Sequence, residues 1–189
     1  MSCASRSRAS ARSSTPSSDL SARRHRGALT VGVSDAGPSG RARLEAVARW
    51  LQDVAFGDVL DAGLQDGAWV VRRTRLEVAR MPVLGERVAL CTWCSGIGPR
   101  TAERRTTVEG DRGGAAEAVA VWAHLDPVTG VPARIGERFA EIYGPSAGPD
   151  RPDHRLRHPP PPDGATRLPW TFRAADLDVA AHVNNAVYW

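Results

Sequence analysis

Five polar side chains that could move protons or orient an oxyanion lie close together near the carboxyl end of the sequence. They are Asp176, Asp178, His182, Asn184 and Asn185. A carboxylate four residues before a histidine can lie beside the imidazole at the start of a helix, where unpaired backbone N–H groups would stabilise a developing oxyanion. A purely structural interpretation stays open, because aspartate and asparagine are also ordinary N-cap residues for a helix that begins near Asn185.

The spacing of these residues resembles a signature of a known enzyme family. Residues 176–188 read DLDVAAHVNNAVY, which is similar to the D-L-D-x-x-x-H-V-N-N-x-x-Y string that opens the second hotdog domain of acyl-ACP thioesterases. Related strings occur in single-domain hotdog acyl-CoA thioesterases. Three further strings, VLGE, TWCSG and WAHLDPVTG at residues 83–86, 92–96 and 122–130, are similar to the first domain of the same family.

The resemblance implies a role for each matching residue. Asp178 would be the catalytic carboxylate, acting as general base or as nucleophile, and His182 would carry protons. Asn184 and Asn185 would organise the turn and bring its backbone donors to the thioester oxygen. Ala180 departs from the plant enzymes, which have asparagine there, so one polarising contact is absent.

The function that the resemblance implies is release of fatty acid from acyl-acyl-carrier-protein in fatty acid biosynthesis, without a metal or cofactor. The acyl carrier protein would be the partner, and Arg173, beside the motif, would bind the phosphopantetheine phosphate. Two alternatives remain: an acyl-CoA thioesterase, and a non-catalytic hotdog protein that holds an acyl chain or a protein partner.

The sequence ends at Trp189, before the remaining helix, strands and further catalytic residue of the family's second domain. We therefore expect either a fragment of a longer gene product or a homodimer that pairs through the edges of the hotdog sheets.

The hydrophobic periodicity predicts one long helix among several strands. Apolar residues at helical spacing, among them Leu44, Val47, Trp50 and Leu51, predict a helix from about residue 44 that is capped by Ser39 and closed near Gly63. Alternating patterns predict strands over residues 28–34, 68–79, 86–97, 100–108 and 115–125, and a short helix is expected over 134–143. This order indicates an α+β hotdog fold, in which a curled antiparallel sheet wraps one long central helix.

Composition divides the chain into four parts. Residues 1–26 form a Ser/Arg-rich tail that is expected to be disordered, and residues 27–144 form the N-terminal hotdog domain. Residues 145–167 form a Pro-rich linker. Residues 168–189 would start a second, incomplete hotdog, with a short strand around Trp170 and Phe172.

Charge and cysteine content argue against several other classes of protein. All 25 basic residues are arginine, and six arginines against one aspartate put a net charge of +5 before residue 27, so the remainder is nearly neutral and no nucleic-acid partner is expected. No apolar run approaches the ~20 residues of a membrane helix. Cys91 and Cys94 lie on a predicted strand and point to opposite faces, which favours two reduced thiols in a cytoplasmic protein over a metal or redox pair.

Three other polar sites invite a structural interpretation. Asp35 is predicted to form a turn and a helix cap, and His124 is predicted to be a core or rim histidine. Glu103, Arg104 and Arg105 are predicted to form a solvated strand face, although the arginines could also meet an acidic carrier protein.

Overall fold

The computed structural model of the chain describes residues 22–64, 67–155 and 158–189. Most of the predicted disordered tail, residues 1–21, lies outside the described residues. The predicted boundary between this tail and the hotdog domain, at residue 26, lies too far along the sequence, because the first strand already begins at His25.

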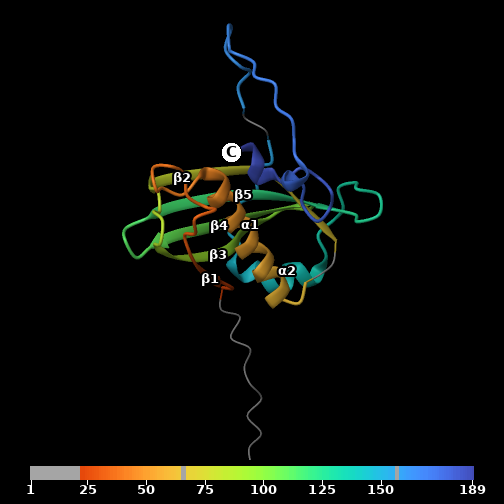
Figure 1. Ribbon diagram of the computed structural model, residues 1–189. Coiled ribbons are helices and arrows are strands. Elements are labelled where there is room, and N and C mark those ends of the chain that lie inside the picture. Colours follow the sequence, from red (N-terminus) through yellow and green to blue (C-terminus); the bar gives the residue numbers. More distant parts are fainter. Residues whose placement is uncertain (1–21, 65–66, 156–157) are drawn as a thin grey trace, which may run out of the picture.

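The described residues form one antiparallel sheet in the order β1-β3-β4-β5-β2. The strands are β1 (His25–Thr30), β2 (Ala68–Arg80), β3 (Arg87–Ile97), β4 (Thr101–Gly110) and β5 (Ala115–Leu125). One long helix, α1 (Leu44–Asp61), lies across a face of this sheet (Figure 1). The remaining elements are short: α2 (Glu137–Tyr143), η1 (Gly144–Ser146), η2 (Ala174–Asp176) and η3 (Asn185–Tyr188). The predicted α+β hotdog architecture is confirmed.

The buried face of α1 explains why the sheet wraps it. Val47, Trp50, Leu51 and Val54 recur at helical spacing, and all are at least nine-tenths buried. They pack against apolar residues that alternate along β3 and β4, such as Val88, whose neighbours on the strand face outward.

A buried polar layer divides the core into two apolar clusters. Along β3 the order is Leu90 in the first cluster, then Thr92, then Cys94 in the second. The same order recurs on β4, where Thr106 and Arg104 separate the first cluster from the second, and Thr92, Thr106 and Arg104 are all buried. The layer includes Asp58 of α1, which is fully buried. A charged layer of this kind needs internal partners, since a buried charge is costly unless it is paired.

The predicted ends of the helix are partly confirmed. Gly63 closes α1 as expected: it has a φ of +63° and its N–H group donates to the carbonyl oxygen of Leu60. Ser39 is not the N-cap, because that position is taken by Arg43. The Ser39 hydroxyl instead accepts from the Arg41 N–H group in the preceding turn.

The strand predicted around Trp170 and Phe172 is wrong. These residues have no regular structure, and the segment after them contains η2, η3 and an isolated bridge between Leu177 and Val183. A strand is stable only beside a neighbour that accepts its backbone hydrogen bonds. No such neighbour for residues 168–173 exists in the part of the chain that the structure describes.

Candidate active site

The turn that carries the catalytic candidates is closed by the Asp178 carboxylate. Asp178 Oδ1 accepts from the backbone N–H groups of Ala180 and His182 at 2.9 and 3.1 Å. The Asp178 N–H group donates to the His182 carbonyl oxygen at 2.8 Å. Ala181 completes the turn with a φ of +59°, a left-handed conformation that only glycine adopts without strain. The spacing of four residues between Asp178 and His182 is therefore what closes this turn.

The predicted pairing of the Asp178 carboxylate with the His182 imidazole is not formed. Within the described residues, the carboxylate contacts the backbone of His182, and no hydrogen bond or ion pair joins it to the ring. The imidazole is exposed, and Asp178 is half-buried. The structure thus places the two residues in one turn with both side chains open to a reacting group.

Asn184 joins the turn to the long helix. Its Oδ1 accepts from the Ala186 N–H group at 2.8 Å and caps η3, so the interpretation of Asn184 as a cap is confirmed. The same oxygen accepts from Nε2 of Gln52, on α1, at 3.2 Å. A role for Gln52 was not predicted from the sequence. A polar residue beside the buried Leu51 on α1 lies at the border of the apolar face, and this position could have indicated a contact with another element.

Asn185 lies at the wall of a large cavity beside this contact. We call it the motif-side cavity; its volume is about 920 Å³. Its lining includes Leu51 and Gln52 of α1, Ala118 and Ala120 of β5, and Asn185 and Trp189 near the C-terminus. Asn185 Oδ1 is buried and has no hydrogen-bond partner among the described residues.

A second cavity continues along the C-terminal half of α1. This apolar cavity has a volume of about 480 Å³, and its lining includes Ala55, Val59, Leu64, Trp69, Ala102 and Phe139. Small side chains such as Ala102 on β4 leave this space open between the helix and the sheet. Three residues, Gln52, Arg104 and Trp122, line both cavities, so the two spaces adjoin.

Arg104 corrects the prediction of a solvated strand face. Its side chain is 9% exposed, whereas that of Arg105 is 52% exposed. Arg104 lies two residues after Ala102 and two before Thr106, so its side chain points to the same inward face of β4 as theirs. The polarity of the run from Glu103 to Arg105 concealed this alternation.

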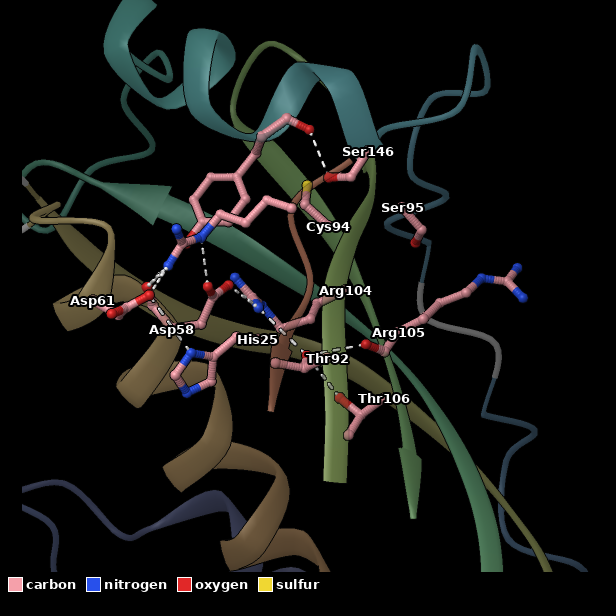
Figure 2. Close-up of polar contacts among 12 residues, drawn as sticks. His25, Asp58, Asp61, Thr92, Cys94, Ser95, Arg104, Arg105, Thr106 and Ser146 are labelled. Atoms are coloured by element: carbon pink, nitrogen blue, oxygen red, sulfur yellow. Dashed lines mark hydrogen bonds and ion pairs between the residues drawn. The ribbon is translucent and has the colours of Figure 1, made fainter. Parts of the chain in front are cut away.

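The inward Arg104 belongs to an ion-pair network centred on Asp58 (Figure 2). Arg104 Nη1 donates to Asp58 Oδ2 at 2.6 Å, and Arg23 Nε donates to Asp58 Oδ1 at 2.7 Å. The Tyr143 hydroxyl donates to the Asp58 carbonyl oxygen at 3.4 Å, and burial raises the pKa of Tyr143 to about 12. Arg104 Nη1 also donates to the Thr92 hydroxyl at 3.4 Å. This network occupies the polar layer between the two apolar clusters.

The sequence profile of the acyl-ACP thioesterase N-terminal domain matches residues 23–143. The chain belongs to the acyl-ACP thioesterase family. The matched range covers α1, the whole sheet and α2, and it ends before the turn of Asp178 and His182.

Two individual relatives are similar to this chain. The chain is 29% identical over 153 residues to the uncharacterized protein Rv2001 of Mycobacterium tuberculosis, with 78% of this chain and 60% of that protein covered. It is 28% identical over 140 residues to the chloroplastic acyl-[acyl-carrier-protein] hydrolase FATB3 of Cuphea viscosissima, covering 70% of this chain and 34% of that protein. The chain therefore spans 60% of the length of the first of these curated relatives and 34% of the second.

The fold is shared with solved thioesterases. The 12:0-ACP thioesterase from Umbellularia californica superposes with a TM-score of 0.68 at 23% identity, over 87% of this chain and 72% of that one. At this level of identity the match shows the hotdog fold.

Arg173, the predicted phosphate ligand of this acyl-ACP thioesterase family member, pairs with Asp176. Its Nη2 lies 2.9 Å from Asp176 Oδ1, and its backbone N–H group donates to Asp176 Oδ2 at 2.7 Å. These hydrogen bonds from Arg173 hold the pKa of Asp176 below its ordinary value. The Arg173 side chain is 77% exposed, so a phosphate could reach it, and its role stays a prediction.

Asp35 fixes a turn and His124 is half-buried, as the sequence predicts, but Asp35 is not the cap of α1, because Arg43 takes that position. Asp35 Oδ2 accepts from the Gly32 N–H group at 2.9 Å, and Oδ1 accepts from Arg49 at 3.3 Å, so the carboxylate fixes a turn. Its carbonyl oxygen also accepts from the N–H group of Arg43, the N-cap of α1. His124 Nδ1 lies 3.3 Å from the Ala133 carbonyl oxygen, and its ring centre is 4.9 Å from that of Trp69.

Cys91 and Cys94 lie on β3 as free thiols. Burial raises the pKa of the Cys94 thiol to about 11. Within the described residues, no group of three or more His, Cys, Asp or Glu side chains is arranged to hold a metal ion. None of the helices in the described part of the chain combines the length and the apolar character needed to cross a membrane.

Proposed function

We propose that this chain contains the acyl-binding domain and part of the catalytic site of a thioester hydrolase that releases fatty acid from acyl-acyl-carrier-protein in fatty acid biosynthesis. The observation that carries the proposal is the contact between Gln52 of α1 and Asn184 of the motif. It holds the Asp178–His182 turn beside a cavity that adjoins an apolar one. The names of FATB3 and of the Umbellularia californica enzyme support an acyl-ACP substrate.

The proposed reaction uses the turn as an acid–base unit. Asp178 takes a proton from water as the water oxygen attacks the thioester carbonyl carbon, and the C–S bond then breaks. His182 supplies the proton that the departing thiolate takes up. Asn184 orients the turn through its cap on η3, and Asn185, at the cavity wall, would help to bind the thioester oxygen. The acyl carrier protein would dock with its phosphopantetheine phosphate on Arg173.

The test is to incubate the purified chain with long-chain acyl-acyl-carrier-protein and to measure released thiol and fatty acid. We expect Asp178→Ala and His182→Ala each to lower the rate by about 100-fold or more. The matched control is Asp163→Ala, which removes an exposed carboxylate from the Pro-rich segment. Unchanged turnover in both motif variants would contradict the proposed roles, and exchanging the carrier for coenzyme A separates the two classes of substrate.

A second candidate function is acyl-chain binding without hydrolysis. Two observations favour it: the Asp178 carboxylate is already used by two backbone N–H groups, and Ala180 lacks the polar side chain of the plant enzymes. Binding of the acyl-acyl-carrier-protein without release of fatty acid would support this function.

The outer edge of β2 supports a proposal about assembly. β2 has 13 residues and pairs only with β5 among the described strands. We propose that this edge pairs with a second hotdog sheet, either in a homodimer or from another domain of the same polypeptide, in a cytoplasmic protein. Sedimentation of the 189-residue chain as a strict monomer would exclude the homodimer.

A further inference from the structure

The wall between the two cavities is polar, although the cavity along the C-terminal half of α1 is largely apolar. Gln52 on α1, Arg104 on β4 and Trp122 on β5 are the residues that line both cavities. Trp122 pairs with Ala102 in the sheet, and Arg104 pairs with Ala120. The two large side chains are therefore diagonal neighbours across β4 and β5, and the alanines opposite them leave space at this junction.

Each of the three junction residues carries N–H groups, and their acceptors differ. Gln52 Nε2 donates to Asn184. Arg104 Nη1 donates to Asp58 and to Thr92. The indole Nε1 of Trp122 is buried and has no acceptor among the described residues. A buried donor without an acceptor is destabilising, and such a group in a folded protein calls for an explanation.

A saturated acyl chain would leave this donor unsatisfied. Methylene groups accept no hydrogen bond, so an alkyl chain that passed from the motif-side cavity into the apolar cavity would gain only apolar contacts at the junction. Because Trp122 Nε1 is covered in the structure, an oxygen atom on the chain would accept from it after a small rotation of the indole ring, and would lie beside the Arg104 guanidinium. A site that hydrogen-bonds an oxygen binds the analogue that lacks it less tightly, because its polar group is then left unpaired.

We propose that the junction of Gln52, Arg104 and Trp122 selects acyl chains that carry an oxygen substituent, such as a hydroxyl group, over unsubstituted chains. This inference rests on the proposed acyl-binding function, and it names the class of acyl group that the two cavities accept. Trp122 is the specificity-determining residue, since its donor has no acceptor within the described part of the protein.

The test compares the binding of dodecanoate with that of dodecanoates hydroxylated near the carboxylate, at mid-chain or at the far end. Isothermal titration calorimetry on the 189-residue chain gives each Kd. We expect the best hydroxylated acid to bind about five- to tenfold more tightly than dodecanoate, as one added hydrogen bond allows. Trp122→Phe keeps an aromatic ring but removes the N–H group, so the ratio of the Kd for dodecanoate to the Kd for the best hydroxylated acid should fall to about one, whatever the change in the Kd for dodecanoate itself.

The matched control is Trp93→Phe, which makes the same chemical change on β3 at a residue that stacks with Arg24 and lines neither cavity. It should retain the preference. If Trp122→Phe fails to fold, the indole N–H resonance of Trp122 in the unaltered protein replaces it: a downfield shift with the hydroxylated acid and not with dodecanoate supports the inference.

The outcomes separate this inference from the proposed function. Equal affinity for plain and hydroxylated acids, or an unchanged preference in Trp122→Phe, would overturn the inference and leave the acyl-binding function intact. Failure of every acid to bind to the folded chain would overturn both.

Discussion

Asp178 and Glu86 are among the carboxylates that accept backbone hydrogen bonds, and they differ in burial and therefore in role. Asp178 accepts from two N–H groups and is half-buried, so a substrate can reach it. Glu86 is 1% exposed and accepts from the N–H groups of Val83, Arg112 and Gly114 at 2.8, 3.0 and 2.7 Å. The Glu86 carboxylate therefore links the bend before β3, residues 81–86, to the turn between β4 and β5. Because the side chain is buried, a ligand cannot reach it.

Glu86→Gln should destabilise the protein in a pH-dependent way. Burial alone would raise the pKa of Glu86, but the three backbone donors outweigh it and lower that pKa below the ordinary value. The carboxylate therefore stabilises the fold fully above the unfolded pKa of about 4.3, and this contribution is lost as the pH falls through the folded pKa. We expect the variant to lose about 2 kcal/mol of unfolding free energy at pH 7. Urea denaturation at several pH values measures it.

The control for this prediction is Glu109→Gln, since Glu109 is an exposed glutamate on β4 whose side chain has no hydrogen bond to any residue that the structure describes. The free energy of unfolding of Glu109→Gln should match that of the unaltered protein at every pH. A difference between Glu86→Gln and the unaltered protein that stays the same at pH 3 as at pH 7 would show that the ionised carboxylate is not what stabilises the two turns.

The Cys94 thiol should be unreactive in the folded protein. Its pKa of about 11, which results from burial, leaves very little thiolate at pH 8, and the thiolate is the nucleophile. We expect iodoacetamide to label Cys94 on the order of 100-fold more slowly in the native chain than in denaturant. Fragment-ion mass spectrometry distinguishes it from the half-buried Cys91 on the same strand. Equally rapid labelling of both thiols in the native state would contradict the burial of Cys94.

At the scale of elements, hydrophobic periodicity predicted the core of the fold. α1 and the strands β2 to β5 lie within two residues of their predicted bounds at each end, because their apolar residues repeat with a single period. The burial of Arg104 was not predicted, because its inward direction depends on the register of β4. Its pairing with Asp58 depends on the tertiary fold. The contact of Gln52 with Asn184 spans 132 positions, and no local pattern encodes such a separation.

Gln52→Ala should loosen the C-terminal segment without unfolding the hotdog. The variant removes the hydrogen bond from α1 to Asn184 Oδ1, which also caps η3. We expect the amides of Ala186 and Val187 to exchange about two- to tenfold faster with deuterium, as the loss of one hydrogen bond allows. The control is Asp53→Ala, the next residue on α1, which is exposed. Unchanged exchange at both amides in Gln52→Ala would show that other contacts hold the segment on the helix.

At the scale of the whole molecule, the Asp58 network connects elements that the sheet alone does not join. Arg23 precedes β1, Asp58 belongs to α1, Arg104 to β4 and Tyr143 to α2. The layer also lies next to both cavities through Arg104. Its integrity therefore affects the shape of the proposed acyl-binding site as well as the stability of the fold.

Asp58→Asn should be the most destabilising of the substitutions considered, because it leaves Arg104 buried without its counter-charge. Removing one partner of a buried ion pair costs about 3–5 kcal/mol of unfolding free energy, whereas an exposed pair contributes up to about 1 kcal/mol. The matched control is therefore Asp61→Asn, since Asp61 also binds Arg23 but its side chain is 63% exposed. Chemical denaturation measures the loss of unfolding free energy in both variants. Equal losses in the two variants would mean that the buried layer is no more important than the surface pair, and that apolar packing around α1 holds the sheet closed.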